Sequence, residues 1–237
     1  MKALDNEEKH VLAKKIEDGY LLKYKNEFYK LNEKNFEENF AKNEIVILKE
    51  IKDNPIYSIF MATTILATLI IYLGREKYVI LDKNFLIANV VLFANVFLHE
   101  LGHIVVLKIF YNDSKIKVGF KFIFIYPAFY VDTSDSYLLP KYKRIAVYLA
   151  GNFMNCIYVL ATIFVFKELR KYSYAVVTAV LINFLPIVKS DGYYAIMTFF
   201  NRYNFLKSKY QNRIEDTVRG MVMFLFLLLI SKVSAFF

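Results

Sequence analysis

Two histidines and a glutamate in the pattern H-E-x-x-H are the residues of this chain best suited to chemistry. His99 and His103 are four positions apart, so on a helix both imidazoles lie on one face and can reach the same metal ion. Glu100 lies about 100° further round such a helix. Its carboxylate can take a proton from water at the metal and pass it to a leaving amine. The pattern therefore predicts a zinc site.

A catalytic zinc site needs a third protein ligand and an open position for water. Asp191 is our candidate, because it follows an apolar run that Pro186 interrupts, and Gly192 frees the backbone to bend. By itself, an Asp-Gly pair after such a run is typical of a turn at a membrane surface. The histidine pair, and the lack of another acidic residue deep in a later apolar run, favour the ligand.

The alternative interpretation of the H-E-x-x-H pattern is a buried, hydrogen-bonded histidine pair without metal. That alternative must account for three ionisable residues inside an apolar run, where such groups are costly and usually functional. We therefore expect zinc at His99, His103 and Asp191, with Glu100 as the catalytic acid and base.

Composition indicates a membrane protein. Hydrophobic residues make up 57% of the 237 residues, and they come in long runs. The net charge is +9, but Lys and Arg lie mostly between these runs. We interpret them as loop charges that set membrane orientation, not as a nucleic-acid-binding surface. The single cysteine, Cys156, excludes an intramolecular disulfide.

We expect an all-α polytopic membrane protein with about five transmembrane helices, or six, over residues 53–237. The apolar runs lie at residues 55–74, 85–110, 145–166, 174–188 and 220–237. Loops rich and poor in basic residues alternate, which predicts a cytosolic N-terminus.

Residues 1–52 are polar and form a separate cytosolic α+β segment in this prediction. We expect a helix over residues 4–18, a hairpin over residues 20–31 and, capped by Asn32, a second helix to about residue 52. The segment either docks substrate or is a solvated lead-in, and we favour the second.

Three motifs resemble those of the site-2 protease family of intramembrane zinc metalloproteases. They are residues 99–103, residues 151–155, and residues 183–186 with the later Asp191-Gly192. The resemblance covers about residues 85–200. It implies the metal and acid/base roles given above, and it adds Asn155 and Asn183 as residues that hold substrate.

Two residues depart from the family pattern without removing a ligand. Asn152 stands where proline is common, and Ser190 stands where leucine is common. Three of only seven glycines, Gly102, Gly151 and Gly192, fall in the motifs. Small residues there allow close approach of helices, or of a peptide beside the metal.

A looser match joins residues 126–135 and 191–194 to bacterial peptide zinc metalloproteases, which often accompany systems that make and export modified peptides or bacteriocins. This resemblance implies a membrane-associated protein or peptide substrate, partners for peptide export, and the bacterial cytoplasmic membrane. Nucleic acid is not an expected partner.

Residues 118–131 are rich in Phe, Ile, Tyr and Val and are broken by Gly119 and Pro127, so we expect a short β-hairpin. A protease must bind its substrate extended, and a strand edge can add the substrate as another strand. A purely structural re-entrant hairpin is an equal alternative.

Two other functions stay open from the sequence. One is a non-catalytic accessory or immunity factor of a peptide export system that keeps the fold, although such a factor has no need for Glu100 beside two metal ligands. The other is a metal transporter, which the lack of an internal repeat disfavours.

Overall fold

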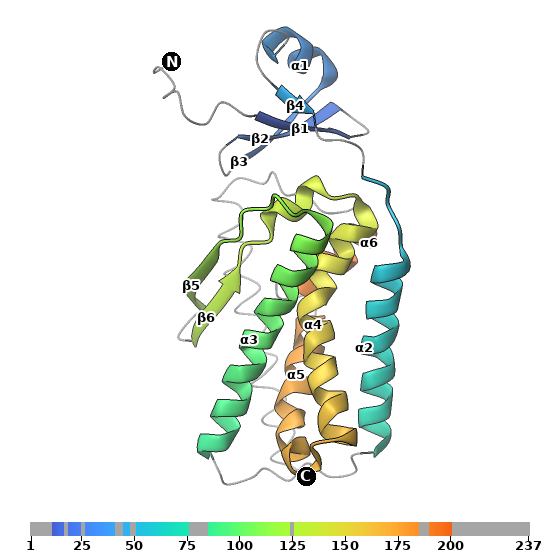
Figure 1. Ribbon diagram of the computed structural model, residues 1–237, viewed down its shortest axis with the longest axis vertical. Coiled ribbons are helices and arrows are strands. Elements are labelled where there is room, and N and C mark those ends of the chain that lie inside the picture. Colours follow the sequence, from blue (N-terminus) through green and yellow to red (C-terminus); the bar gives the residue numbers. More distant parts are fainter. Residues whose placement is uncertain are drawn as a thin grey trace, which may run out of the picture. The chain divides into compact units, whose positions relative to one another are not determined.

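The computed structural model describes eight stretches of the chain: residues 11–16, 19–24, 27–40, 45–47, 51–75, 85–123, 126–184 and 190–200. These stretches belong to two compact units, with the boundary between Lys52 and Asp53. Figure 1 labels their helices and strands.

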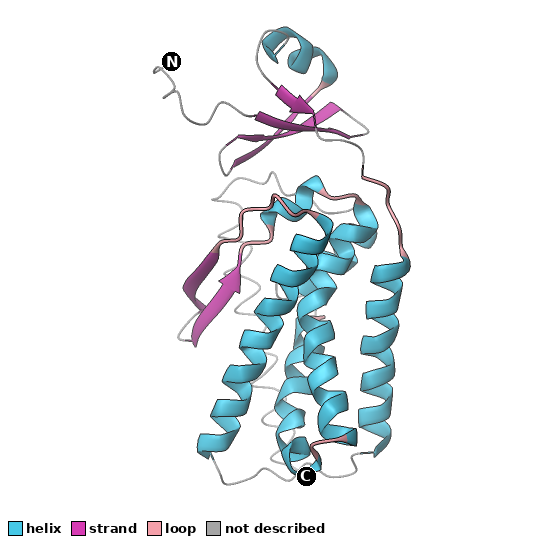
Figure 2. Ribbon diagram, viewed as in Figure 1, coloured by secondary structure: helices cyan, strands magenta, loops and turns pink. Residues whose placement is uncertain are grey.

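The first unit contains a four-stranded sheet in the order β3-β2-β1-β4. Its elements are β1 (Val11–Ile16), β2 (Gly19–Tyr24), β3 (Glu27–Leu31), α1 (Glu33–Phe40) and β4 (Ile45–Ile47). The pairs β1–β2 and β2–β3 are antiparallel, whereas β4 runs parallel to β1 (Figure 2).

In this unit the hairpin predicted over residues 20–31 is confirmed as β2–β3. Asn32 caps α1, because its Oδ1 accepts a hydrogen bond of 2.9 Å from the main-chain N–H three residues on. The two predicted helices were wrong in extent or type. Residues 11–16 form a strand that pairs on both sides, with β2 and with β4. The helix after Asn32 ends at Phe40, and Ile45–Ile47 is a strand.

The second unit is mainly helical. Its elements are α2 (Ile56–Arg75), α3 (Phe85–Phe110), β5 (Val118–Ile123), β6 (Tyr126–Val131), η1 (Ser134–Leu138), α4 (Lys141–Phe164), η2 (Lys167–Tyr172), α5 (Ser173–Asn183) and α6 (Asp191–Phe199). Helix α4 is central and contacts α2, α3, α5 and α6 (Figure 1). The antiparallel hairpin β5–β6 confirms the strands predicted over residues 118–131.

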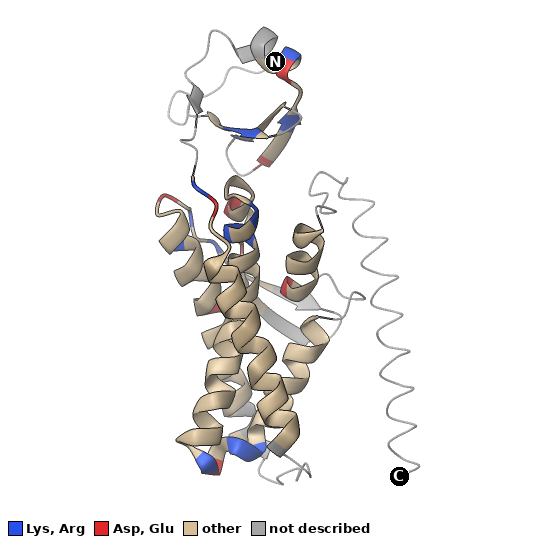
Figure 3. Ribbon diagram, turned by 90° about the vertical axis from the view of Figure 1, so that its right-hand side faces the viewer, with Lys and Arg blue, Asp and Glu red and all other residues tan. Residues whose placement is uncertain are grey.

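Three helices of the described residues are long and apolar enough to cross a membrane: Ile56–Gly74, Val90–Phe110 and Lys141–Phe164. Many of their large apolar side chains are exposed, among them Phe60, Leu66, Phe93 and Phe97. In the second unit, the Lys and Arg segments coloured in Figure 3 lie at the ends of the helices. This arrangement is consistent with a membrane protein, in which exposed apolar surface on the spans is expected.

The bounds predicted for the apolar runs agree with the observed helices to different degrees. Helix α3 has the predicted bounds, and α4 begins at Lys141 instead of residue 145. Helix α5 covers the first part of the run predicted over residues 174–188, and the remainder of that run lies outside the described residues. The last run, residues 220–237, also lies outside them, so the number of five spans stays a prediction.

Helix α4 is held at both ends. Near its start, the Asp53 carboxylate accepts a hydrogen bond from the main-chain N–H of Tyr142, with oxygen distances of 3.2 and 3.1 Å. Near its end, Val159 and Ile163 are buried in a cluster with residues of α2 and α5. These contacts fix the helix that packs against the histidine pair.

Candidate metal centre

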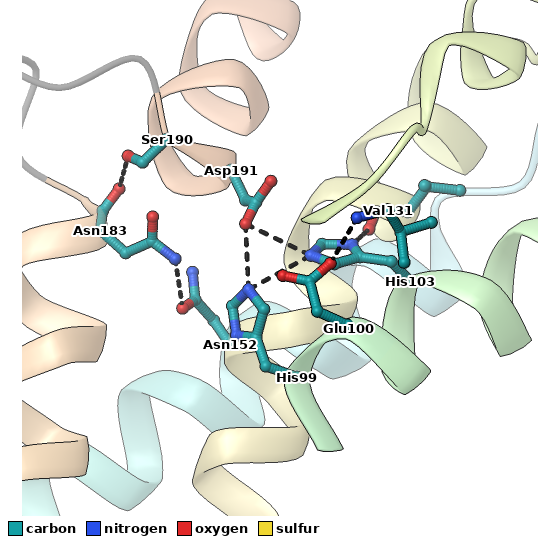
Figure 4. Close-up of polar contacts among 9 residues, drawn as sticks. His99, Glu100, His103, Val131, Asn152, Asn183, Ser190 and Asp191 are labelled. Carbon is teal, nitrogen blue, oxygen red and sulfur yellow. Dashed lines mark hydrogen bonds and ion pairs between the residues drawn. The ribbon is translucent and has the colours of Figure 1, made fainter. Parts of the chain in front are cut away.

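Three side-chain atoms from two helices converge on one point of the second unit (Figure 4). The Nε2 atoms of His99 and His103, both on α3, lie 3.3 Å apart. The Oδ2 atom of Asp191, at the start of α6, lies 3.1 Å from His99 Nε2 and 3.2 Å from His103 Nε2. The structure thus brings together the three residues predicted as ligands, and the group could hold a metal ion.

The size of this triangle fits zinc. With ligand bonds of about 2.0–2.1 Å in a tetrahedral site, neighbouring ligand atoms lie roughly 3.3–3.4 Å apart. The observed separations of 3.1, 3.2 and 3.3 Å are close to that value. Two imidazoles and one carboxylate are also a donor set that zinc accepts, with a fourth position left open.

A main-chain carbonyl fixes the orientation of His103. Its Nδ1 lies 2.8 Å from the carbonyl oxygen of Val147 on α4, and this contact is buried. Since a carbonyl only accepts, Nδ1 carries the proton and Nε2 presents its lone pair to the site. This is the arrangement that metal-binding histidines usually have.

Two glycines allow α3 and α4 to pack closely at this point. A Cβ atom on Gly151 would lie 2.4 Å from His99 Nε2 and 2.6 Å from His103 Nε2. A Cβ atom on Gly102 would lie 2.7 Å from the Met154 side chain. Any larger residue at Gly151 would therefore enter the space of the converging nitrogens, which confirms the predicted close approach.

Glu100 lies beside the histidine pair and is held by the hairpin. Its Oε2 accepts a hydrogen bond of 2.7 Å from the main-chain N–H of Val131, the last residue of β6. Figure 4 shows the carboxylate on the same side of α3 as the two imidazoles. The structure thus links the predicted acid and base to a strand that the sequence motif does not include.

The pairing of β5 and β6 explains why this N–H is available. Antiparallel pairs alternate between hydrogen-bonded and non-hydrogen-bonded positions. The pair Lys117–Asp132 is bonded, since the N–H of Asp132 donates to the Lys117 carbonyl at 2.8 Å. Val131 is therefore in a non-bonded pair with Val118, and its N–H faces the outer edge of β6. That edge is the one nearer the histidines.

The charges of the site call for a cation. With neutral imidazoles, Glu100 and Asp191 together carry two negative charges in a bundle of apolar helices. Among the ion pairs of the described residues, Asp191 pairs only with His99 and His103. Two partly buried carboxylates close together repel each other, and a divalent ion would balance both charges.

The predicted asparagines lie near the site but do not touch the converging atoms in any described contact. The Nδ2 atom of Asn183, at the end of α5, donates to Oδ1 of Asn152 at 2.8 Å. Asn155 lies on α4 one turn beyond Gly151 and is 5% exposed, and its Oδ1 has no partner among the described residues.

Sequence reasoning missed four contacts around the site. Two are main-chain hydrogen bonds: the Val131 N–H donates to Glu100, and the Val147 carbonyl contacts His103 Nδ1. The other two are the hydrogen bonds that join Asn152 and Ser190 to Asn183. The first two involve main-chain groups, which any residue type supplies, so no sequence signal marks them. Asn152 and Ser190 were marked only as departures from a family pattern.

A comparison with curated proteins finds a bacterial relative. The chain is 33% identical over 144 residues to the "Putative peptide zinc metalloprotease protein YydH" of Bacillus subtilis (strain 168). The resemblance to bacterial peptide zinc metalloproteases is confirmed. The match covers 58% of this chain and 57% of the relative, so the chain spans little more than half of that protein's length. No family model and no solved structure matches the chain.

Proposed function

We propose that this chain is an intramembrane zinc metalloprotease of the site-2 type, which hydrolyses peptide bonds of a membrane-associated protein or peptide. The observation that carries the proposal is the convergence of His99, His103 and Asp191 beside Glu100. The histidines and Glu100 belong to a helix long enough to span a membrane. The similarity to a relative named as a peptide zinc metalloprotease supports the same class of reaction.

The two histidines would bind the metal through Nε2, and Asp191 would bind it through its carboxylate. Zinc, when bound, lowers the pKa of a water molecule towards 7 and polarises the scissile carbonyl. The Val147 carbonyl keeps His103 in the tautomer that this binding needs.

Glu100 would move the proton. It takes a proton from the attacking water as the new C–O bond forms, and it gives that proton to the amine nitrogen as the C–N bond breaks. The Val131 N–H holds Oε2, which leaves Oε1 for the transfer. Asn155 and Asn183 would steady the substrate, as the family resemblance implies.

The outer edge of β6 would hold the substrate in an extended form. In a helix, a peptide carbonyl is shielded by its own turn, and an unwound segment has backbone groups that lipid cannot satisfy. A strand edge satisfies them. Phe129 is two residues before Val131, so its N–H faces the same outer edge.

The partners follow from the class of protease. The bilayer would surround the spans. We place the N-terminus in the cytosol, as the alternation of basic loops predicts, and the chain in a bacterial cytoplasmic membrane. The name of the relative supports a peptide as the substrate. Maturation of a secreted modified peptide or bacteriocin, next to proteins that export it, is the setting we propose.

The test of the proposed reaction is hydrolysis by purified protein in liposomes. Wild type and Glu100→Gln are incubated in ¹⁸O-water with a defined library of apolar synthetic peptides, and new termini are found by mass spectrometry. We expect the wild type to place ¹⁸O in new C-termini. The variant should lose roughly 10²–10⁴-fold in rate while its zinc content is unchanged. Equal cleavage by both proteins would contradict the role of Glu100.

A second test addresses the strand edge. Phe129→Pro removes an N–H from the outer edge of β6, and Phe120→Pro is its matched control, because Phe120 is the cross-strand partner and faces the opposite edge. Neither proline removes a bond between the strands. We expect kcat/KM to fall about 10-fold, the effect of one backbone hydrogen bond to substrate, only for Phe129→Pro. Equal effects of the two prolines would make the hairpin structural.

A further inference from the structure

Asn183 joins three parts of the second unit that meet at the candidate metal centre. Its side chain donates to Oδ1 of Asn152 on α4 at 2.8 Å, and its main-chain oxygen accepts from the hydroxyl of Ser190 (Figure 4). Ser190 directly precedes Asp191. A chain of hydrogen bonds thus runs from α4 through the end of α5 to the residue before the carboxylate.

The start of α6 also packs tightly on Asn183. A Cβ atom on Gly192 would lie 2.4 Å from the Asn183 carbonyl oxygen and 2.8 Å from the Phe184 ring. Both neighbours of Asp191 in the sequence, Ser190 and Gly192, therefore contact the same carbonyl group. The position of the Asp191 backbone is set by this contact with the end of α5.

The other end of the chain of bonds lies next to the histidines. Asn152 is fully buried, and it follows Gly151, whose Cα faces His99 and His103 so closely that a Cβ atom would overlap their Nε2 atoms. A shift of Asn183 relative to Asn152 would therefore move Asp191 relative to the histidines. In apolar surroundings, a buried amide keeps its partner because water does not replace it.

We propose that Asn152, Asn183 and Ser190 form a tether that positions the Asp191 carboxylate against the two histidines and so sets the affinity for zinc. This inference rests on the zinc site of the proposed function. None of the three residues is a metal ligand, and each affects zinc binding through the position of Asp191. The two departures from the family pattern, Asn152 and Ser190, are the two ends of this tether.

The first experiment measures the dissociation constant of Zn²⁺ alone for the full chain in detergent, by competition with a chromophoric chelator. Ser190→Ala removes the hydroxyl, Ser190→Thr keeps it, and Ser58→Ala is the matched control, since that hydroxyl donates to the Pro55 carbonyl at the start of α2. We expect Ser190→Ala to raise the dissociation constant for zinc about 10-fold, as is typical for residues that orient metal ligands. Ser190→Thr and Ser58→Ala should match the wild type.

The second experiment adds Asn152→Leu, which keeps the volume and removes the acceptor, with Asn155→Leu as the control on the same helix. Asn152→Leu should raise the constant by about 10-fold or more, whereas Asn155→Leu should leave it unchanged and lower cleavage only. In the double variant Asn152→Leu/Ser190→Ala, the dissociation constant for zinc should not exceed the larger of the two single-variant values. The effects should not add, because both changes break the same chain of hydrogen bonds.

The outcomes separate this inference from the proposed function. Wild-type zinc affinity in Ser190→Ala overturns the tether, and so does wild-type affinity in an Asn152→Leu protein that elutes as folded wild type does. If Asn152→Leu does not fold, the comparison of Ser190→Ala with Ser190→Thr decides alone. A wild-type chain that binds no zinc overturns the proposed function itself.

Discussion

The candidate metal centre has two unlike halves. The histidine half comes from one helix of 26 residues, α3, and is packed against α4 through Gly102 and Gly151. The aspartate half is the first residue of α6, a helix of nine residues, and its contacts run through Asn183. In the histidine half, the helix itself sets the spacing of the two ligands. In the aspartate half, tertiary contacts set the position of the one ligand.

The ligand positions in the two halves have different physical origins. Residues four apart on a helix face the same way whatever surrounds them, so the histidine half is organised before any metal binds. The carboxylate has no such local constraint. We therefore expect changes in the histidine half to lower zinc binding more than changes in the aspartate half.

The largest effect is expected for His103→Ala, which removes a ligand from the histidine half. Zinc content should fall from about one ion per chain to background, since two ligands do not make a catalytic zinc site. Metal analysis of the purified variant beside the wild type checks this. Equal zinc in both proteins would show that the metal, if any, binds elsewhere.

A smaller but still large effect is expected for Gly151→Ala. The added Cβ would meet His99 Nε2 at 2.4 Å, so the imidazole must leave its position. Zinc affinity should fall about 100-fold, the upper end of the range for residues next to metal ligands. Gly74→Ala is the control, because nothing lies within 4 Å of a Cβ atom there. A similar loss in both variants would point to general destabilisation.

The smallest effect is expected for Gly192→Ala in the aspartate half. Its added Cβ would meet the Asn183 carbonyl at 2.4 Å, but a helix of nine residues can shift to relieve the overlap. Zinc affinity should fall about 10-fold, the lower end of the same range. A loss greater than that of Gly151→Ala, measured by the same chelator competition, would reverse the comparison between the halves.

The sequence predicted the histidine half well because its information is local. The spacing of His99 and His103 needs only a helix, and the bounds predicted for α3 agree with the structure. Asp191 was predicted from a motif and from the lack of another acidic residue deep in a later apolar run. The bond between Asn152 and Asn183 was not predicted, because it joins two helices and no sequence spacing encodes it.

The first unit shows the opposite case. Residues 11–16 have the sequence VLAKKI, whose apolar and basic residues fit a helix as well as a strand. The strand is set by its two neighbours: β1 pairs antiparallel with β2, which follows it in sequence, and parallel with the more distant β4 at Ile45–Ile47. The hairpin at residues 20–31 was predicted because apolar and polar residues alternate around Lys25-Asn26-Glu27, and β2 and β3 confirm it. The sequence did not predict the pairing of β1 with β2 on one side and with β4 on the other.

The most direct test of the central claim is the X-ray absorption spectrum of zinc in the purified wild-type chain. We expect a four-coordinate ion with nitrogen and oxygen ligands at about 2.0–2.2 Å, and imidazole scattering from two histidines. The imidazole signal should weaken in His103→Ala. A spectrum with sulfur at about 2.3 Å, or one without two imidazoles in the wild type, would contradict zinc binding by His99, His103 and Asp191.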